Sequence, residues 1–135
     1  MSNLIFVNLP VKNLSRTNAF FTALGFAFNP QFSDEKATCM IINDSAFVML
    51  LSEPFFKGFT PKAIADASQT TEVLIALSAD SREAVDDMVQ KAIAGGGSEA
   101  RPAEDLGFMY HRAFNDLDGH IWEVTWMNPA AMPPQ

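Results

Sequence analysis

Glu123 is the strongest candidate for a functional side chain in this sequence, because it is a carboxylate within an apolar segment. It lies in the stretch NDLDGHIWEVTW, residues 115–126, on an apolar segment that follows a turn. An ionised carboxylate is seldom buried without a partner. The stretch therefore predicts a metal ligand, a catalytic acid or base, or one half of a salt bridge. The sequence alone assigns no catalytic residue, and Glu123 is the candidate for that role.

A cationic partner for Glu123 is available on the preceding strand. If residues 116–119 form the turn, Arg112 lies opposite Glu123 on the same face of the hairpin. An Arg–Glu pair would keep the carboxylate ionised in an apolar cleft. Tyr110 shares the face of Arg112 and could form a hydrogen bond with a ligand. The sequence favours a structural pair over a role in binding or catalysis, and the two roles are compatible.

Two histidines lie near Glu123 in the sequence. His120 and Glu123 are three residues apart, so a strand points them to opposite faces, which disfavours a chelating pair. We expect His120 at the rim, capping the turn. His111 alternates with Tyr110 and Arg112 and is predicted to point away from the face of Glu123, as a partly exposed histidine.

The elements that must position these residues occur twice along the chain. Each half reads as a strand, a helix and three strands, and such an internal repeat is an informative signal. The helix N-caps are predicted at Ser15 and Ser81, and the stops at Gly25 and Gly95. The predicted strands are residues 3–11, 26–32, 37–43 and 46–52, then 71–79, 98–103, 107–114 and 120–127.

This repeat predicts an α+β fold of two tandem βαβββ modules in a single domain of 135 residues. Module 1 covers about 3–52 and module 2 about 71–127. Each module would form a mixed four-stranded sheet with a helix on one face, and the other faces would curve around a shared cleft.

The connector, residues 53–70, is broken by prolines and a glycine and is predicted as a loop with one short helix near 61–67. Its side chains at Phe55, Phe56 and Phe59 could form a lid on an apolar ligand. They could equally be buried against a second subunit.

The duplicated unit resembles the vicinal oxygen chelate superfamily, which includes glyoxalase I, bleomycin-resistance proteins and extradiol dioxygenases. The resemblance rests on NLPVKNLSRTNAFFTALGF in the first copy and DLDGHIWEV closing the second. It extends from about Leu4 to Asn128 and is closest to the small bacterial glyoxalase/bleomycin-resistance group. It implies the fold that this superfamily shares.

The resemblance also implies where a metal ion would bind. In the superfamily's metalloenzymes, four cleft-facing positions, usually His, Gln or Glu, lie on the first and last strand of each module. Here these positions hold Phe6, Met49, Leu74 and Glu123. Phe and Leu cannot coordinate a metal, and a thioether is a poor ligand for hard divalent ions. No metal is therefore expected, with Glu123 as the only surviving ligand position.

Strand alternation gives the remaining residues of the predicted ligand-binding cleft. Asn8 could orient a substrate carbonyl, or could bond to a neighbouring backbone group. The predicted cleft residues are Phe6, Asn8, Phe47, Met49, Leu74, Ser78, Tyr110, Arg112, Glu123 and Thr125.

Composition limits the classes of partner. The net charge is −7 and no Lys/Arg cluster occurs, which disfavours nucleic acid and anionic lipid. No apolar run approaches the roughly 20 residues that a membrane span requires. The first residues do not read as a signal peptide, and the expected location is the cytoplasm. Cys39 is the only cysteine, which excludes internal disulfides.

The resulting hypothesis is metal-independent binding of a small apolar or aromatic molecule in the cleft, with no cofactor. The alternative is a metal-dependent glyoxalase-like lyase or extradiol-type dioxygenase. A third possibility is a vestigial cleft in a protein that acts through its dimer. A homodimer is expected in each case.

Overall fold

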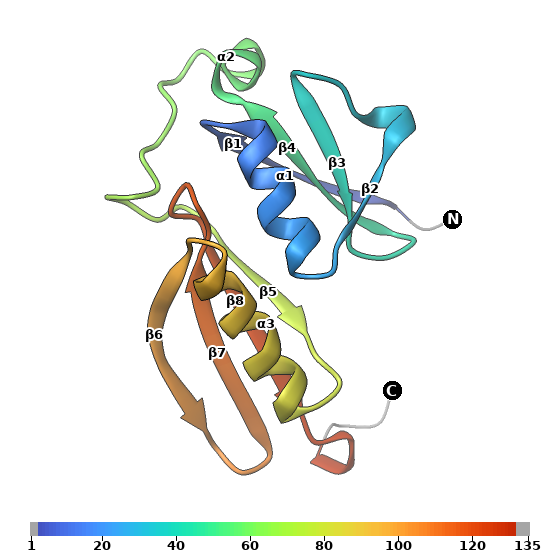
Figure 1. Cartoon of the computed structure of the whole chain (residues 1–135), viewed down its shortest axis with the longest axis vertical. Helices are drawn as coiled ribbons and strands as arrows, with labels where there is room; N and C mark the ends of the chain where they lie inside the picture. The colour runs from blue at the N-terminus through green and yellow to red at the C-terminus, as the bar shows by residue number, and fades with distance from the viewer. Residues whose placement is uncertain (1–2, 132–135) are drawn as a thin grey trace. The chain divides into compact units, whose positions relative to one another are not determined.

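The computed structural model describes residues 3–131 and contains two units with the same βαβββ topology (Figure 1). The contacts divide the chain between Ala65 and Asp66. The first unit contains β1 (Ile5–Val11), α1 (Leu14–Ala23), β2 (Ala27–Asn29), β3 (Ala37–Ile41) and β4 (Ala46–Ser52). The second contains β5 (Leu74–Ser78), α3 (Arg82–Ala94), β6 (Ser98–Asp105), β7 (Met109–Asn115) and β8 (Ile121–Met127). The predicted α+β fold of tandem βαβββ modules is confirmed.

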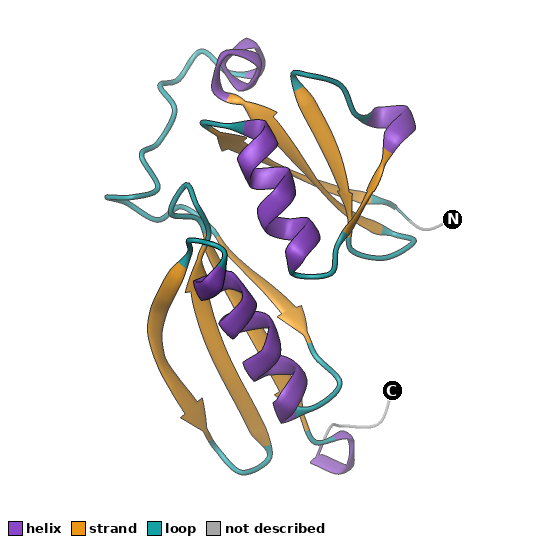
Figure 2. Ribbon diagram, in the orientation of Figure 1, coloured by secondary structure: helices purple, strands orange, loops and turns teal. Residues whose placement is uncertain are grey.

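Each unit forms one four-stranded mixed sheet. The strand orders are β1-β4-β3-β2 and β5-β8-β7-β6. In each sheet the first and last strand of the unit pair in parallel, and the remaining pairs are antiparallel. Figure 2 shows one long helix lying along one face of each sheet. Within residues 3–131, neither unit has a second long helix to cover the opposite face of its sheet.

The side chains between each helix and its sheet form the core. In the first unit the buried side chains include Val11, Phe21, Met40, Val48 and Leu50. In the second they include Val85, Val89, Phe114, Trp122 and Val124. Alternation along β8 therefore places Trp122 and Val124 toward α3 and Glu123 away from it. No helix in residues 3–131 is long and apolar enough to cross a membrane.

The helix ends differ from the predicted ones in two places. The N-cap of α1 is Asn13 rather than Ser15, because the Asn13 side chain accepts the backbone N–H of Arg16 at 3.1 Å. Ser81 caps α3 as predicted, by accepting the N–H of Ala84 at 3.0 Å. The C-cap of α3 is Gly95 as predicted, whereas the C-cap of α1 is Leu24, one residue before the predicted Gly25.

The connector contains a helix at its start instead of near residues 61–67. The helix α2 (Glu53–Phe56) continues into the 3₁₀ turn η2 (Lys57–Phe59), and residues 61–67 are not helical. Pro54 is compatible with α2 because the first helical turn needs no N–H donor from that residue. Similarly, the strand predicted at 26–32 shortens to β2, because Pro30 begins the 3₁₀ turn η1 (Pro30–Phe32). A last 3₁₀ turn is η3 (Pro129–Ala131).

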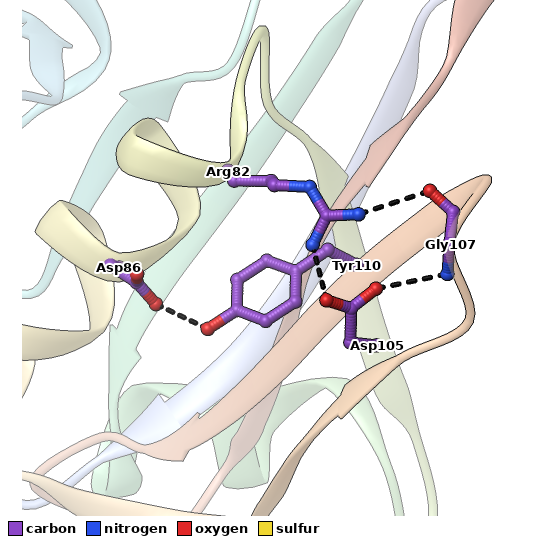
Figure 3. Close-up of polar contacts among 5 residues, drawn as sticks. All are labelled: Arg82, Asp86, Asp105, Gly107 and Tyr110. Carbon is purple, nitrogen blue, oxygen red and sulfur yellow. Dashed lines mark hydrogen bonds and ion pairs between the residues drawn. The ribbon is translucent and has the colours of Figure 1, made fainter.

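Polar contacts fasten the start of α3 to the β6–β7 hairpin (Figure 3). Arg82 pairs with Asp105 at 2.6 Å and donates to the carbonyl oxygen of Gly107 at 3.0 Å. Its guanidinium lies 5.4 Å from the ring centroid of Tyr110 and 5.0 Å from that of Trp126. The Tyr110 hydroxyl donates to Asp86 at 2.6 Å. The α3 face of this hairpin is therefore occupied by structural contacts.

We predict that the free energy of unfolding of Tyr110→Phe will change less between pH 7 and about pH 3 than that of the wild-type protein. The Tyr110 hydrogen bond is the first cause that lowers the pKa of Asp86, and the hydrogen bond from Arg112 adds to it. A lowered folded-state pKa stabilises the protein above the unfolded value of about 3.9, and this contribution is lost as the pH falls. Asp86 is 43% exposed, so we expect an effect below about 1 kcal/mol.

The measurement is the free energy of unfolding in urea from pH 7 down to pH 3 for both proteins. The variant should be less stable at neutral pH, and the two curves should converge as the pH falls. Parallel curves over the whole range would contradict this assignment.

Candidate functional site

Glu123 lies on the open face of the second sheet, by which we mean the face opposite α3. Its side chain is 23% exposed. The neighbouring strands contribute two rows of residues in register with it. The first row consists of Arg101, Ala113, Glu123 and Ala76. The second row consists of Glu104, His111, Thr125 and Ser78.

The partner of Glu123 is Arg101. The Arg101 Nη2 atom lies 2.7 Å from Glu123 Oε2. The two residues lie on β6 and β8, with Ala113 of β7 between them. Ala113 is completely buried. The carboxylate is thus neutralised by a cation that reaches across one strand.

His111 extends this pair into a chain of four side chains. Its Nδ1 atom lies 3.2 Å from Arg101 Nη2, and its Nε2 atom lies 2.9 Å from Glu104 Oε1. Because a guanidinium only donates, Nδ1 must accept, so Nε2 carries the hydrogen and donates to Glu104. We call Glu123, Arg101, His111 and Glu104 the open-face network. With this neutral imidazole, the network carries one positive and two negative charges.

Bulges in β6 bring Arg101 and Glu104 to the open face. The register shifts once between Glu99 and Arg101 and again between Arg101 and Glu104. Without the first shift Glu99 and Arg101 would share a face, because alternate residues of a strand point the same way. Bulges re-aim side chains in this manner. Pro102 lies between the two residues and is tolerated because β6 is an edge strand.

The predicted pairing of Arg112 with Glu123 is wrong. Ala113, not Arg112, is opposite Glu123, so the true register differs by one residue and reverses the faces of β7. Arg112 points toward α3 and pairs with Asp86 at 3.0 Å and Glu99 at 2.6 Å. Tyr110 lies on that same face. His111, which was predicted to point away from Glu123, shares its face instead.

Asp116 sets this register from inside the turn. Its buried carboxylate accepts the backbone N–H groups of Asp118 at 2.9 Å and His120 at 3.0 Å, and the indole N–H of Trp122 at 3.0 Å. Burial raises the pKa of Asp116, and the electrostatic interaction with His120 and the hydrogen bonds from Trp122 and Asp118 oppose that rise. The backbone N–H of Asp116 also donates to the carbonyl of His120 at 2.9 Å. The turn is thus longer than the predicted 116–119, and His120 is buried in it rather than placed at an exposed rim.

The remaining predicted cleft residues lie on open faces. Leu74 is exposed on β5, and Ser78 pairs in register with Thr125. In the first unit, Phe6 is exposed and its ring stacks on Phe47, with centroids 5.0 Å apart. Asn8 is opposite Met49, and its amide donates to the Phe6 carbonyl at 3.4 Å. Asn8 therefore makes the neighbouring backbone contact that was one of its two expected roles.

The residues at the four metal positions do not fit a divalent ion. Phe6 and Leu74 have no donor atom, Met49 has only a thioether, and the Glu123 carboxylate is paired with a guanidinium. A metal bound to Glu123 would lie beside the positive charge of Arg101. Across residues 3–131, no three His, Cys, Asp or Glu side chains are grouped so that they could hold an ion.

Ala113→Leu should separate Arg101 from Glu123, because a larger side chain would fill the space over which Arg101 reaches. We expect a loss of about 1–3 kcal/mol of stability from overpacking. We also expect the coupling energy between Arg101 and Glu123 to fall to near zero from roughly 1 kcal/mol. The measurement is a double-mutant cycle with Arg101→Met and Glu123→Gln, in both backgrounds.

Ala76→Leu is the matched control for this cycle. Ala76 flanks Glu123 on the side away from Arg101, so the same enlargement should leave the coupling unchanged. An undiminished coupling energy in Ala113→Leu would contradict the geometry of the row.

Comparisons with known proteins agree with this fold. Residues 3–43 match the family model described as Bleomycin resistance protein-like N-terminal. Curated protein sequences give no match. A hypothetical protein, SA1046, from S. aureus is 28% identical, with 93% of this chain and 95% of that chain covered and a TM-score of 0.79.

Two further solved structures are similar to the chain. A glyoxalase-related enzyme from Fulvimarina pelagi is 20% identical, covers 93% of this chain and 88% of its own, and has a TM-score of 0.78. The fosfomycin resistance protein FosX from Listeria monocytogenes is 22% identical, with 96% of this chain and 97% of that chain covered and a TM-score of 0.68.

Proposed function

We propose that this chain is a member of the vicinal oxygen chelate superfamily. We propose further that it binds a small, partly aromatic or apolar molecule on the open face of its second sheet, without a metal ion. The Arg101–Glu123 ion pair is the observation that carries this proposal. It uses the one surviving donor of the superfamily's metal positions. A neutral ligand can contact this pair directly, whereas a divalent ion would add a second cation beside the guanidinium of Arg101.

The surroundings of the pair suit such a ligand. The open face combines the polar network with apolar side chains at Leu74 and Ile121, which are neighbours in register. Binding sites for small molecules typically combine apolar lining with a few oriented polar groups. In the first unit, the stacked pair of Phe6 and Phe47 offers an exposed aromatic surface of its own.

The experiment is a thermal-shift screen of small aromatic molecules with a chelator present throughout. A ligand that binds the folded state should raise the melting temperature, by an amount equivalent to about 2.7 kcal/mol at 100 times its Kd. Glu123→Gln should reduce the shift. Glu99→Gln is the matched control, because Glu99 also pairs with an arginine but lies on the α3 face.

The alternative is a metal-dependent lyase or dioxygenase, and two of the similar structures carry the words glyoxalase or dioxygenase in their names. This alternative requires that other metal-binding side chains join Glu123, beside the positive charge of Arg101. A ligand-induced shift that appears only when a divalent ion replaces the chelator would favour it over our proposal.

We further propose that the protein is a homodimer, because one edge of each sheet is unprotected. β2 has only three residues, and β6 carries Pro102 and two bulges, which are devices that prevent edge-to-edge pairing. β1 carries Pro10 near its C-terminal end, but Ile5–Leu9 and the whole of β5 contain no proline or bulge, and exposed apolar side chains lie along them, among them Ile5 and Leu74. A second copy would cover this surface.

Light scattering after size exclusion should therefore give twice the chain mass at micromolar concentration. Ile5→Lys and Leu74→Lys place a charge on these edges and should shift the protein toward the monomer. Phe32→Lys is the control, because Phe32 is equally exposed but lies in η1. A monomeric wild-type protein would contradict the proposal.

A further inference from the structure

The ion pair of the open-face network leaves one acceptor and several donors unused. Within residues 3–131, Glu123 Oε1 accepts no hydrogen bond from the protein, and Nε and Nη1 of Arg101 donate none. Both side chains reach solvent, with exposures of 23% and 37%. A hydrogen-bond acceptor and a row of donors are therefore presented side by side to an incoming molecule.

We infer that the ligand of this face carries a lactam or cis-amide edge, in which an N–H donor lies next to a carbonyl acceptor. The N–H would donate to Glu123 Oε1, and the carbonyl oxygen would accept from Arg101. This inference rests on the proposed function and names the chemical class of its ligand. A half-buried carboxylate oxygen gains most from a ligand that supplies the missing donor.

Charge separates this class of ligand from the two nearest alternatives. The open-face network has two carboxylates, Glu123 and Glu104, against one guanidinium, because His111 accepts from Arg101 and is neutral. A carboxylate ligand would add an anion beside them in a chain whose net charge is already −7. An amidinium ligand would direct its donors at Arg101, which has only donors. A neutral lactam matches the acceptor and the donors together.

Space for a ring lies next to this edge. Ala76 is the neighbour of Glu123 on β5, and its small, exposed side chain leaves the sheet surface open there. One row further, Leu74 and Ile121 offer apolar contacts. A ring fused to the lactam can rest on these side chains while its polar edge faces Glu123 and Arg101. The ligand class is therefore an aromatic lactam rather than a simple amide.

Isothermal titration with a matched set of bicyclic compounds, in chelator, tests this inference. The probe is 1(2H)-isoquinolinone, which has the lactam edge. Its N-methyl derivative keeps the ring and carbonyl but lacks the donor, and 1-naphthoate has acceptors only. We expect the lactam to bind at least about tenfold more tightly than either, since one unmatched polar group costs about 1.4 kcal/mol or more.

Glu123→Leu should remove the preference for the lactam over its N-methyl derivative, and Glu99→Gln should retain it. Should Glu123→Leu fail to fold, the compound series on the wild-type protein is still decisive. Equal binding of the lactam and its N-methyl derivative would overturn the inference but leave the proposed function standing. A preference for 1-naphthoate would do the same. Absence of binding by every compound would overturn the inference, and the thermal-shift screen then decides the proposed function separately.

Discussion

Replacing Asp116 with alanine is expected to lower the free energy of unfolding by about 3–5 kcal/mol, the largest effect of any single substitution considered. The Asp116 carboxylate is 4% exposed and accepts three N–H groups, from Asp118, His120 and Trp122. Alanine would leave these donors without their acceptor. Each buried donor that loses its partner costs roughly 1–3 kcal/mol.

The same substitution should disturb the open face, although Asp116 is not part of it. The turn holds Ala113 opposite Glu123, and a slip by one residue would move every side chain of β8 to the other face. We therefore expect Asp116→Ala to lose ligand binding as well as stability. Urea unfolding measures the first effect and titration of the folded protein at low temperature measures the second.

Asp116→Asn is the conservative comparison, because its amide oxygen can replace only part of the carboxylate's acceptor capacity. It should fall between the wild-type protein and Asp116→Ala. A loss below about 1 kcal/mol for the alanine variant would contradict the role of Asp116 as the residue that organises the turn.

Gly119→Ala is expected to lower the free energy of unfolding by about 2–4 kcal/mol, for two separate reasons. The backbone of Gly119 has φ +91, a conformation that L-residues rarely adopt. An added Cβ would also lie 2.9 Å from the carbonyl carbon and oxygen of Ala67 and 3.0 Å from the backbone nitrogen of Ser68. These are backbone atoms and cannot rotate away.

Substitutions at two other glycines distinguish the cost of the positive φ from the cost of the close contact with Ala67. Gly25 has φ +107 but no atom within 4 Å of its virtual Cβ, so Gly25→Ala should show the conformational cost alone, about 1–2 kcal/mol. Gly58 has neither feature, and Gly58→Ala should change stability by less than about 0.5 kcal/mol. Unfolding in urea measures all three variants, and equal losses for Gly119 and Gly25 would show that the approach of Ala67 has no cost.

The sequence was sufficient for the architecture because periodicity is a local property. Alternation around Trp122 and Val124 correctly predicted that Glu123 faces away from the helix. The repeat predicted two sheets with one helix each. These inferences depend only on which residues are apolar and at what spacing.

The partner of Glu123 could not be predicted in the same way, because it depends on register. A turn of one more residue exchanged Arg112 and His111 between the faces of β7, and no apolar pattern marks that difference. The sequence does contain one clue to the longer turn, which is Asp116. Its carboxylate accepts backbone N–H groups as far along the chain as His120, so the turn extends to that residue. Arg101 depends further on the bulges of β6, for which Pro102 is the only local signal.

Elemental analysis of tag-free protein, purified without chelator, tests most directly the claim that a guanidinium rather than a metal ion holds Glu123. The structure places Arg101 Nη2 2.7 Å from the carboxylate, so a metal ion on Glu123 would lie beside a positive charge. We predict only traces of manganese, iron, nickel and zinc, with no difference between the wild-type protein and Glu123→Gln. One equivalent of any of these metals, lost in Glu123→Gln, would contradict the account.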